Sequence, residues 1–128
     1  MVLGLLLPLL PVPSAAGQRS LTPLESRRLV LAAKPSEARD HAVTIELDHE
    51  HNGCAVWHLY VPGGSVPEFN TATLDWLSVD LRTGEVWNFQ NGRIANVRVE
   101  RMQRELRKRL GVSDAEVSAA IAKPCETR

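Results

Sequence analysis

Residues 41–61 of the chain read HAVTIELDHEHNGCAVWHLYV, and this stretch decides the fold. Apolar side chains occupy alternate positions before His51-Asn52-Gly53, and the alternation resumes after it. The alternating apolar set is Val43, Ile45, Leu47, Ala55, Trp57, Leu59 and Val61. A period of two predicts a half-buried strand, and Asn-Gly between two such runs predicts a β-hairpin. The sequence therefore predicts antiparallel strands over residues 41–50 and 54–61.

The length of the turn decides which faces of these two strands join. A two-residue turn at Asn52-Gly53 would place the apolar side chains of the first strand on the side of His58. A three-residue turn with a left-handed glycine would place them beside Trp57 and its apolar neighbours. We favour the three-residue turn, because it gathers nearly every large apolar side chain on one face. In that register His49 faces the core, and Cys54 lies on the outer face within reach of a C-terminal tail.

A second hairpin is expected from residues 74–81 and 85–90, which flank Arg82-Thr83-Gly84. Gly84 suits a left-handed turn position, and the Asp80 carboxylate can cap the turn. Both faces of this hairpin are apolar, with Leu77, Val79 and Val86 on one and Trp76, Trp87 and Phe89 on the other. One face can pack on helices, so the aromatic face needs a cover. The loop at residues 62–70, a second subunit and a ligand are the alternatives.

Capping signals mark the helices on both sides of the hairpins. Thr22-Pro23-Leu24-Glu25 predicts a helix start, Lys34-Pro35 predicts its end, and residues 36–39 add one further turn. Apolar residues at three- and four-residue spacing predict an amphipathic helix that ends at Gly111. These residues are Val99, Met102, Leu106 and Leu110. A capping box at residues 113–116 opens a last short helix that runs through Ala122.

The order of these elements predicts an α+β fold. It comprises an N-terminal helix, two antiparallel β-hairpins that form a four-stranded sheet, and two C-terminal helices packed on the sheet.

The first 16 residues are interpreted as a signal peptide. Residues 2–13 carry no charge, and Ser14-Ala15-Ala16 supplies small residues where a signal peptidase cleaves. This apolar run is shorter than the roughly 20 residues that a membrane span needs. We expect cleavage after Ala16, a single α+β domain over residues 17–128, no membrane span in the mature form, and a periplasmic or secreted location. The alternative is a buried N-terminal helix that is retained.

The chain has two cysteines, Cys54 and Cys125. In an oxidising compartment an isolated pair is most simply a disulfide. It would close a loop of about 70 residues and contribute about 4 kcal/mol by the chain-entropy estimate. The alternative is a pair of unpaired thiols.

The four histidines, His41, His49, His51 and His58, lie within one short stretch that also contains carboxylates. Imidazole and carboxylate suit zinc, so His49, His51 and His58 are the candidate metal ligands. In the favoured register they do not converge, and we expect structural or solvated histidines and no cofactor. No nucleophile elbow, phosphate-binding loop or dinucleotide fingerprint is present in the sequence. A small metal-dependent hydrolase that uses this cluster is the alternative function.

The charge pattern bears on the kind of partner. The formal net charge is +0, which disfavours a dedicated nucleic-acid binder. Residues 98–109 nevertheless form a basic helix, interpreted as a solvated face, as a docking face for an acidic partner, or as a balance for the acidic first hairpin. The candidate partner-binding residues are Trp76, Trp87, Phe89, Arg101, Arg104 and Lys108.

The hairpin over residues 77–87 contains Asp80-x-x-Thr83-Gly84-x-Val86. It resembles the hairpin of small exported bacterial domains of the PepSY and NTF2-like immunity-protein kinds. The resemblance implies a non-catalytic domain that is inhibitory or protective toward secreted enzymes, and it assigns no functional residue. We therefore expect an exported binding domain, of the inhibitor or immunity type or an accessory protein, for a protein partner in the bacterial envelope.

Overall fold

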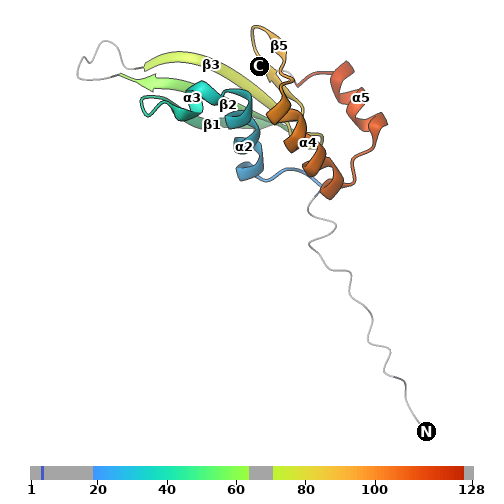
Figure 1. Cartoon of the computed structure of the whole chain (residues 1–128). Coiled ribbons are helices and arrows are strands. Elements are labelled where there is room, and N and C mark those ends of the chain that lie inside the picture. Colours follow the sequence, from blue (N-terminus) through green and yellow to red (C-terminus); the bar gives the residue numbers. More distant parts are fainter. Residues whose placement is uncertain (1–3, 5–18, 64–70, 126–128) are drawn as a thin grey trace.

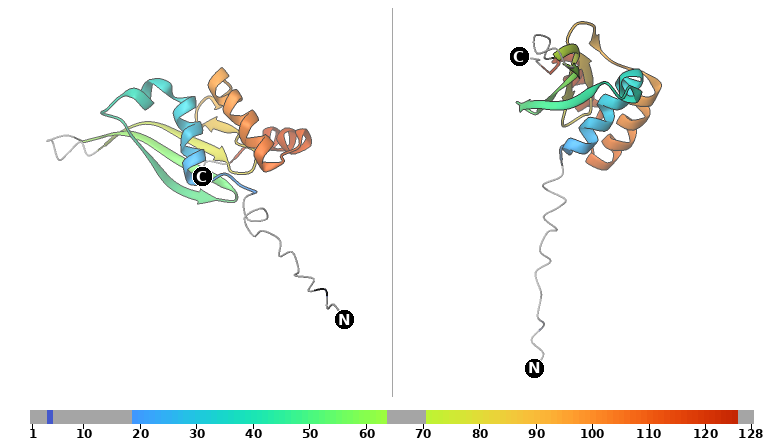
Figure 2. Two further views of the ribbon diagram at one scale, coloured as in Figure 1. Left: turned by 60° about the horizontal axis from the view of Figure 1, so that its bottom comes forward. Right: turned by 90° about the vertical axis from the view of Figure 1, so that its left-hand side faces the viewer.

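The computed structural model describes residue 4 and residues 19–63 and 71–125. The elements in chain order are α2 (Pro23–Ala33), α3 (Pro35–Arg39), β1 (Thr44–His51), β2 (Cys54–Pro62), β3 (Thr71–Asp80), β4 (Val86–Asn88), β5 (Gly92–Arg93), α4 (Val97–Leu110) and α5 (Asp114–Ala122). The strands form one five-stranded antiparallel sheet in sequence order. Helices α2 and α4 lie side by side on one face of it (Figures 1 and 2). The expected α+β class is confirmed. The expected signal peptide lies, except for residue 4, outside the described residues.

The turn of the first hairpin differs from the prediction. Asn52 and Gly53 both have positive φ, 49° and 77°, and His51 pairs directly with Cys54. This is the two-residue turn that Asn-Gly favours, because positive φ at both central positions matches the twist of the flanking strands. The expected three-residue turn is therefore wrong.

A β-bulge restores the predicted pairing of apolar faces. The register shifts between Leu47 and His49, so that Leu47 pairs with Trp57 and the extra residue is Asp48. Paired residues project to the same face of a sheet, so Leu47 joins Trp57 on the core side. His49 pairs with Val56 and projects to the outer face, which corrects the expectation that it faces the core.

The first strand also begins later than predicted, at Thr44 instead of residue 41. The Asp40 side chain accepts a hydrogen bond from the backbone N–H of Ala42 at 2.9 Å, which holds residues 40–42 in a turn.

The main core fills the space between the inner face of the sheet and the two long helices. Seven of its side chains are 0% exposed: Leu29, Val30, Leu59, Leu77, Val79, Val86 and Val99. Trp57 is also buried there, and its Nε1 donates a hydrogen bond of 2.7 Å to Ser26 Oγ on α2. A buried indole N–H needs an acceptor, so this contact fixes α2 on the sheet as well as packing it.

The second hairpin has the predicted turn, but its strands span residues 71–80 and 86–88 instead of the expected 74–81 and 85–90. The Asp80 carboxylate accepts from the backbone N–H groups of Arg82 and Thr83 at 2.8 and 2.9 Å, as expected for a capped turn. After β4, Asn88 Oδ1 accepts from the N–H of Gln90 at 2.7 Å, and the chain reverses into β5. The sheet thus has five strands instead of four. A strand of two residues is too short to show the alternation by which strands are recognised.

The helix boundaries are largely those expected. Thr22 and Ser113 form capping boxes, and α4 ends at Gly111 with φ 66°. Helix α4 buries Val99 against the main core. Helix α5 departs from the prediction that both C-terminal helices pack on the sheet, since all its nine residues are at least partly exposed. An ion pair of 2.8 Å between Arg82 and Glu116 ties it to the second hairpin.

Gly84→Ala is expected to lower the free energy of unfolding by about 1–2 kcal/mol, measured by urea unfolding. Gly84 has φ +77°, where an L side chain is strained. The added methyl group would also lie 3.4 Å from Leu29 Cδ1. Gly111→Ala is the matched control, because its φ is +66° with open space around the new Cβ. A loss at Gly84 smaller than that at Gly111 would contradict this account.

Candidate functional site

A row of aromatic rings crosses the face of the sheet opposite α2 and α4. Its members, called the aromatic strip, are His58, Tyr60, Trp76 and Phe89, and each is partly exposed. The His58 ring stacks on Trp76 at a centroid distance of 3.9 Å and on Tyr60 at 4.6 Å. Phe89 lies 6.0 Å from Trp76. The structure thus brings together two of the sequence-predicted partner-binding residues, Trp76 and Phe89, and adds two that the sequence analysis did not select.

Polar contacts hold the aromatic strip in place. A ring nitrogen of His58 lies 2.8 Å from Thr73 Oγ1 on the neighbouring strand. Tyr60 donates its hydroxyl proton to a Glu46 carboxylate oxygen at 2.6 Å. Because the acceptor of this hydrogen bond is a carboxylate, the bond raises the pKa of Tyr60 above its ordinary value of 10.0. Burial and the negative charge of Glu46 act in the same direction.

Tyr60 offers a direct test of this geometry, because it is the one tyrosine of the chain. We expect a spectrophotometric titration near 295 nm to place the ionisation of the protein's phenol above pH 10. Glu46→Ala should shift the midpoint downward, since the phenolate then forms without a neighbouring carboxylate. Glu50→Ala, on the same strand but without a contact to Tyr60, is the control. A midpoint that is identical in wild type and Glu46→Ala would contradict the hydrogen bond.

The predicted disulfide is present and covers part of the outer face. Cys54 and Cys125 are bonded with their Cα atoms 5.9 Å apart, and both pack against Trp87. Trp87 is only 5% exposed, so it has almost no surface to offer a partner. At Trp87, the aromatic face is therefore covered by the chain's own C-terminal tail. This cover was not among the expected alternatives.

The candidate metal ligands project to one face yet do not gather. His49 and His51 lie on β1, and each contacts a sequence neighbour, Asp48 at 2.5 Å and Asn52 at 3.0 Å respectively. His58 belongs to the aromatic strip. Among residues 19–63 and 71–125, no group of three His, Cys, Asp or Glu side chains is arranged to hold a metal ion.

The basic helix divides into residues that stabilise the fold and residues that face solvent. Arg109 pairs with Glu25 on α2 at 2.6 Å, and Arg107 pairs with Glu85. Both carboxylate partners lie outside the first hairpin, one in α2 and the other in the second hairpin. These contacts therefore do not support the interpretation that the basic helix balances the charge of the acidic first hairpin. Arg104 and Lys108 are exposed.

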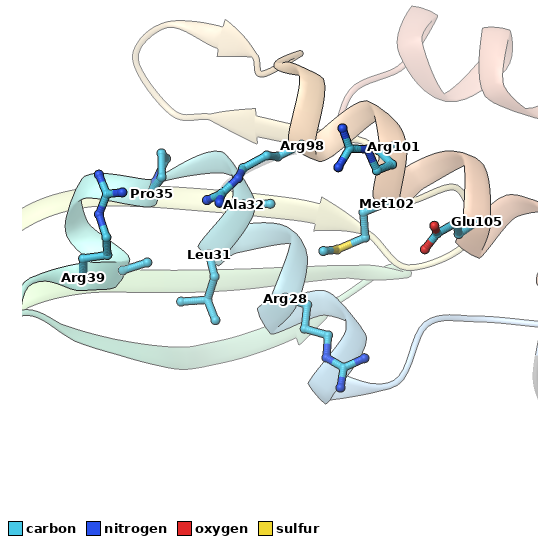
Figure 3. A pocket seen from close by; sticks show the side chains of 10 residues that line it. Arg28, Leu31, Ala32, Pro35, Arg39, Arg98, Arg101, Met102 and Glu105 are labelled. Carbon is cyan, nitrogen blue, oxygen red and sulfur yellow. The ribbon is translucent and has the colours of Figure 1, made fainter.

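Arg101 and Arg98 border a groove between α2, α3 and α4. The groove has a volume of about 390 Å³. It is lined by Arg28, Leu31, Ala32, Pro35, Ala38, Arg39, Arg98, Arg101, Met102 and Glu105. Figure 3 shows Met102 of α4 pointing toward α2, with guanidinium groups around the apolar side chains. An apolar floor with a basic rim suits an amphipathic, negatively charged ligand.

One cluster was missed entirely by sequence reasoning. The Glu85 carboxylate is 0% exposed and accepts from Arg93 Nε at 2.6 Å and from Arg107. Arg107 Nε also donates to the carbonyl of Thr83 at 2.8 Å. The two arginines come from β5 and α4, so no local pattern in the sequence signals that they meet. The cluster ties the segment before β4 to β5 and α4 and serves the fold.

Comparisons with known proteins show a likeness of fold. No protein-family model matches the chain, and no curated protein is significantly similar to it. The chain is similar in structure to a chain of a solved type VI secretion system effector–immunity complex from Pseudomonas protegens, with a TM-score of 0.66 and 20% sequence identity. The similarity covers 82% of this chain and 91% of that chain. In the described part of the chain, no helix has both the length and the apolar character that a membrane span requires.

Proposed function

We propose that this protein is an exported bacterial domain that binds a protein partner and blocks it, in the manner of an immunity protein. The observation that carries the proposal is the fold shared, over most of both chains, with a chain of an effector–immunity complex. At this level of sequence identity a shared fold is an analogy, so the function has to be argued from the surfaces of this chain.

Two surfaces of the described residues support a role in protein binding. The aromatic strip presents partly exposed rings on a rigid sheet, and aromatic side chains are enriched where protein interfaces have their binding energy. The groove offers an apolar floor and arginines, which are also enriched at interfaces. Except for Phe89, which follows β4, the residues of the aromatic strip lie on strands, and the groove lies between helices; this favours binding without a large rearrangement.

The proposed location is the periplasm or the exterior of the cell. The Cys54–Cys125 disulfide supports it, because disulfides persist in oxidising compartments. The leading apolar segment that ends at Ser14-Ala15-Ala16 supports it as well. We expect mass spectrometry of the exported protein to find a first residue at Gly17. An N-terminus at Met1 in exported material would contradict the proposed cleavage.

The function is tested by protection. The mature domain, residues 17–128, is used as bait in the native envelope fraction, and proteins encoded beside its gene are the first candidates among those retained. The candidate is then produced in the periplasm with and without this protein. We expect growth inhibition by the candidate alone, restored growth with both, and a purified complex of defined stoichiometry.

If the two proteins form a complex but growth is not restored, the protein binds its partner without blocking it, and the proposed blocking role is wrong. If no neighbouring or retained protein forms a complex with the purified domain, the proposed function is wrong.

A further inference from the structure

We propose that the groove between α2, α3 and α4 is the docking site for an acidic segment of a protein partner, anchored by an apolar side chain. This inference rests on the proposed function and adds to it the surface and the chemistry by which the partner is recognised.

The floor of the groove defines the anchor. Leu31, Ala32, Pro35 and Ala38 from the N-terminal helices line it together with Met102 from α4. Leu31 and Met102 are only partly buried, so apolar surface is exposed to solvent at the centre of the groove. Filling the groove with an apolar side chain would remove that surface from water, and the flexible Met102 side chain can adapt to its shape.

The rim of the groove defines the charge of the occupant. Four guanidinium groups, those of Arg28, Arg39, Arg98 and Arg101, surround the floor together with one carboxylate, Glu105. None of the four arginines forms an ion pair with a carboxylate among the described residues. By contrast, Arg107 and Arg109, which also belong to α4, both have carboxylate partners within the fold. The rim therefore combines four cationic groups whose charge the described part of the fold leaves without a paired anion.

This excess of positive charge is confined to the groove, which indicates a partner segment with a local negative charge. The chain as a whole has a formal net charge of +0, so no general attraction to polyanions is expected. Nucleic acid would meet the arginines but gains nothing from the apolar floor, because its affinity comes from phosphate contacts. An acidic peptide segment with a Leu or Phe side chain satisfies both the rim and the floor.

The test uses a short fluorescein-labelled peptide that carries two leucines one helical turn apart and glutamates elsewhere. We expect fluorescence anisotropy to show saturable binding that weakens as salt is raised. Arg98→Glu/Arg101→Glu should weaken binding about tenfold, because two cations of the rim become anions. Arg104→Glu/Lys108→Glu is the matched control, with the same change of net charge on the same helix at positions that do not line the groove.

A second measurement locates the peptide. The chain has two methionines, Met1 and Met102. After methionine-methyl labelling, the Met102 signal, assigned through Met102→Leu, should shift on addition of the acidic peptide, and the shift should be absent with a peptide that has lysines in place of the glutamates.

Three results would overturn the inference. They are equal weakening in the two charge-reversal variants, an unshifted Met102 methyl at saturation, and tighter binding of anionic phospholipid vesicles or of an oligonucleotide than of the acidic peptide. The peptide assay needs no natural partner, so its failure leaves the blocking function open. Conversely, failure of the protection experiment with intact peptide binding removes the proposed function and leaves the groove as an acidic-peptide site.

Discussion

Cys54→Ala/Cys125→Ala is expected to lower the free energy of unfolding by about 4 kcal/mol, the largest effect predicted for this protein. The two cysteines are 71 residues apart in the sequence, so their bond closes a long loop and removes much of the conformational freedom of the unfolded chain. The bond also holds the C-terminal tail over Trp87. A domain of ordinary stability has about 5–15 kcal/mol in total, so the variant should lie close to the threshold of folding.

Urea unfolding of the double variant and the oxidised wild type at the same pH measures this loss. Reductant supplies the control, since it should destabilise the wild type by a similar amount and leave the double variant unchanged. The wild type should resist alkylation until it is reduced. Two alkylatable thiols in the native, unreduced protein would show that the disulfide does not form.

Glu85→Ala is expected to lower the free energy of unfolding by about 3 kcal/mol, the second largest effect. The Glu85 carboxylate is 0% exposed and has two arginine partners, so its removal leaves cationic groups without their counter-ion. The side chains of Arg93 and Arg107 are 39% and 19% exposed. They can partly recover their solvation in water, so we expect the lower end of the 3–5 kcal/mol that breaking a buried pair costs.

Chemical unfolding of Glu85→Ala, Arg107→Met and the combined variant provides a double-mutant cycle. We expect the combined variant to lose less than the sum of the single changes, because Arg107→Met removes a charge that Glu85→Ala would leave unpaired. Glu105→Ala, an exposed carboxylate on the rim of the groove, is the control and should change stability by less than about 0.5 kcal/mol. Additive losses in the cycle would show that Glu85 and Arg107 do not interact.

Much of the fold follows from short-range signals in the sequence. The capping boxes at Thr22 and Ser113, the helix end at Gly111 and the Asp80-capped turn all lie where the sequence predicts them. Each depends on residues within about one turn of one another, so a local pattern contains all the information needed. The disulfide was also predictable, because two cysteines allow only one intramolecular pairing.

In the first hairpin, the sequence correctly predicted which apolar faces join, but it predicted the wrong turn length. The alternation of Leu47 with polar neighbours correctly indicated that it joins Trp57. Asn52-Gly53 formed its intrinsically favoured two-residue turn, and the bulge at Asp48 absorbed the mismatch. Burial of apolar side chains outweighed regular pairing at one position, and as a consequence His49 moved to the outer face.

The candidate surfaces were predictable only in part. The sequence selected Trp76, Phe89 and Arg101, and the structure places the first two in the aromatic strip and the third on the rim of the groove. It also selected Trp87, which the C-terminal tail buries. Arg28 and Arg39 escaped selection, because they reach the rim from α2 and α3 and carry no pattern of their own.

The sequence alone determined the class of fold, the positions of the helix ends and turns, the sides on which the strands bury their apolar residues, and the identity of the disulfide pair. These follow from interactions between neighbours in the chain and from the alternation of polar and apolar residues. The tertiary structure decided which side chains far apart in sequence meet: Glu85 with Arg93 and Arg107, Trp57 with Ser26, and the arginines of three helices around one groove. These contacts depend on how the helices pack on the sheet. That packing is set by the shape of the whole core, which side chains from many segments form together.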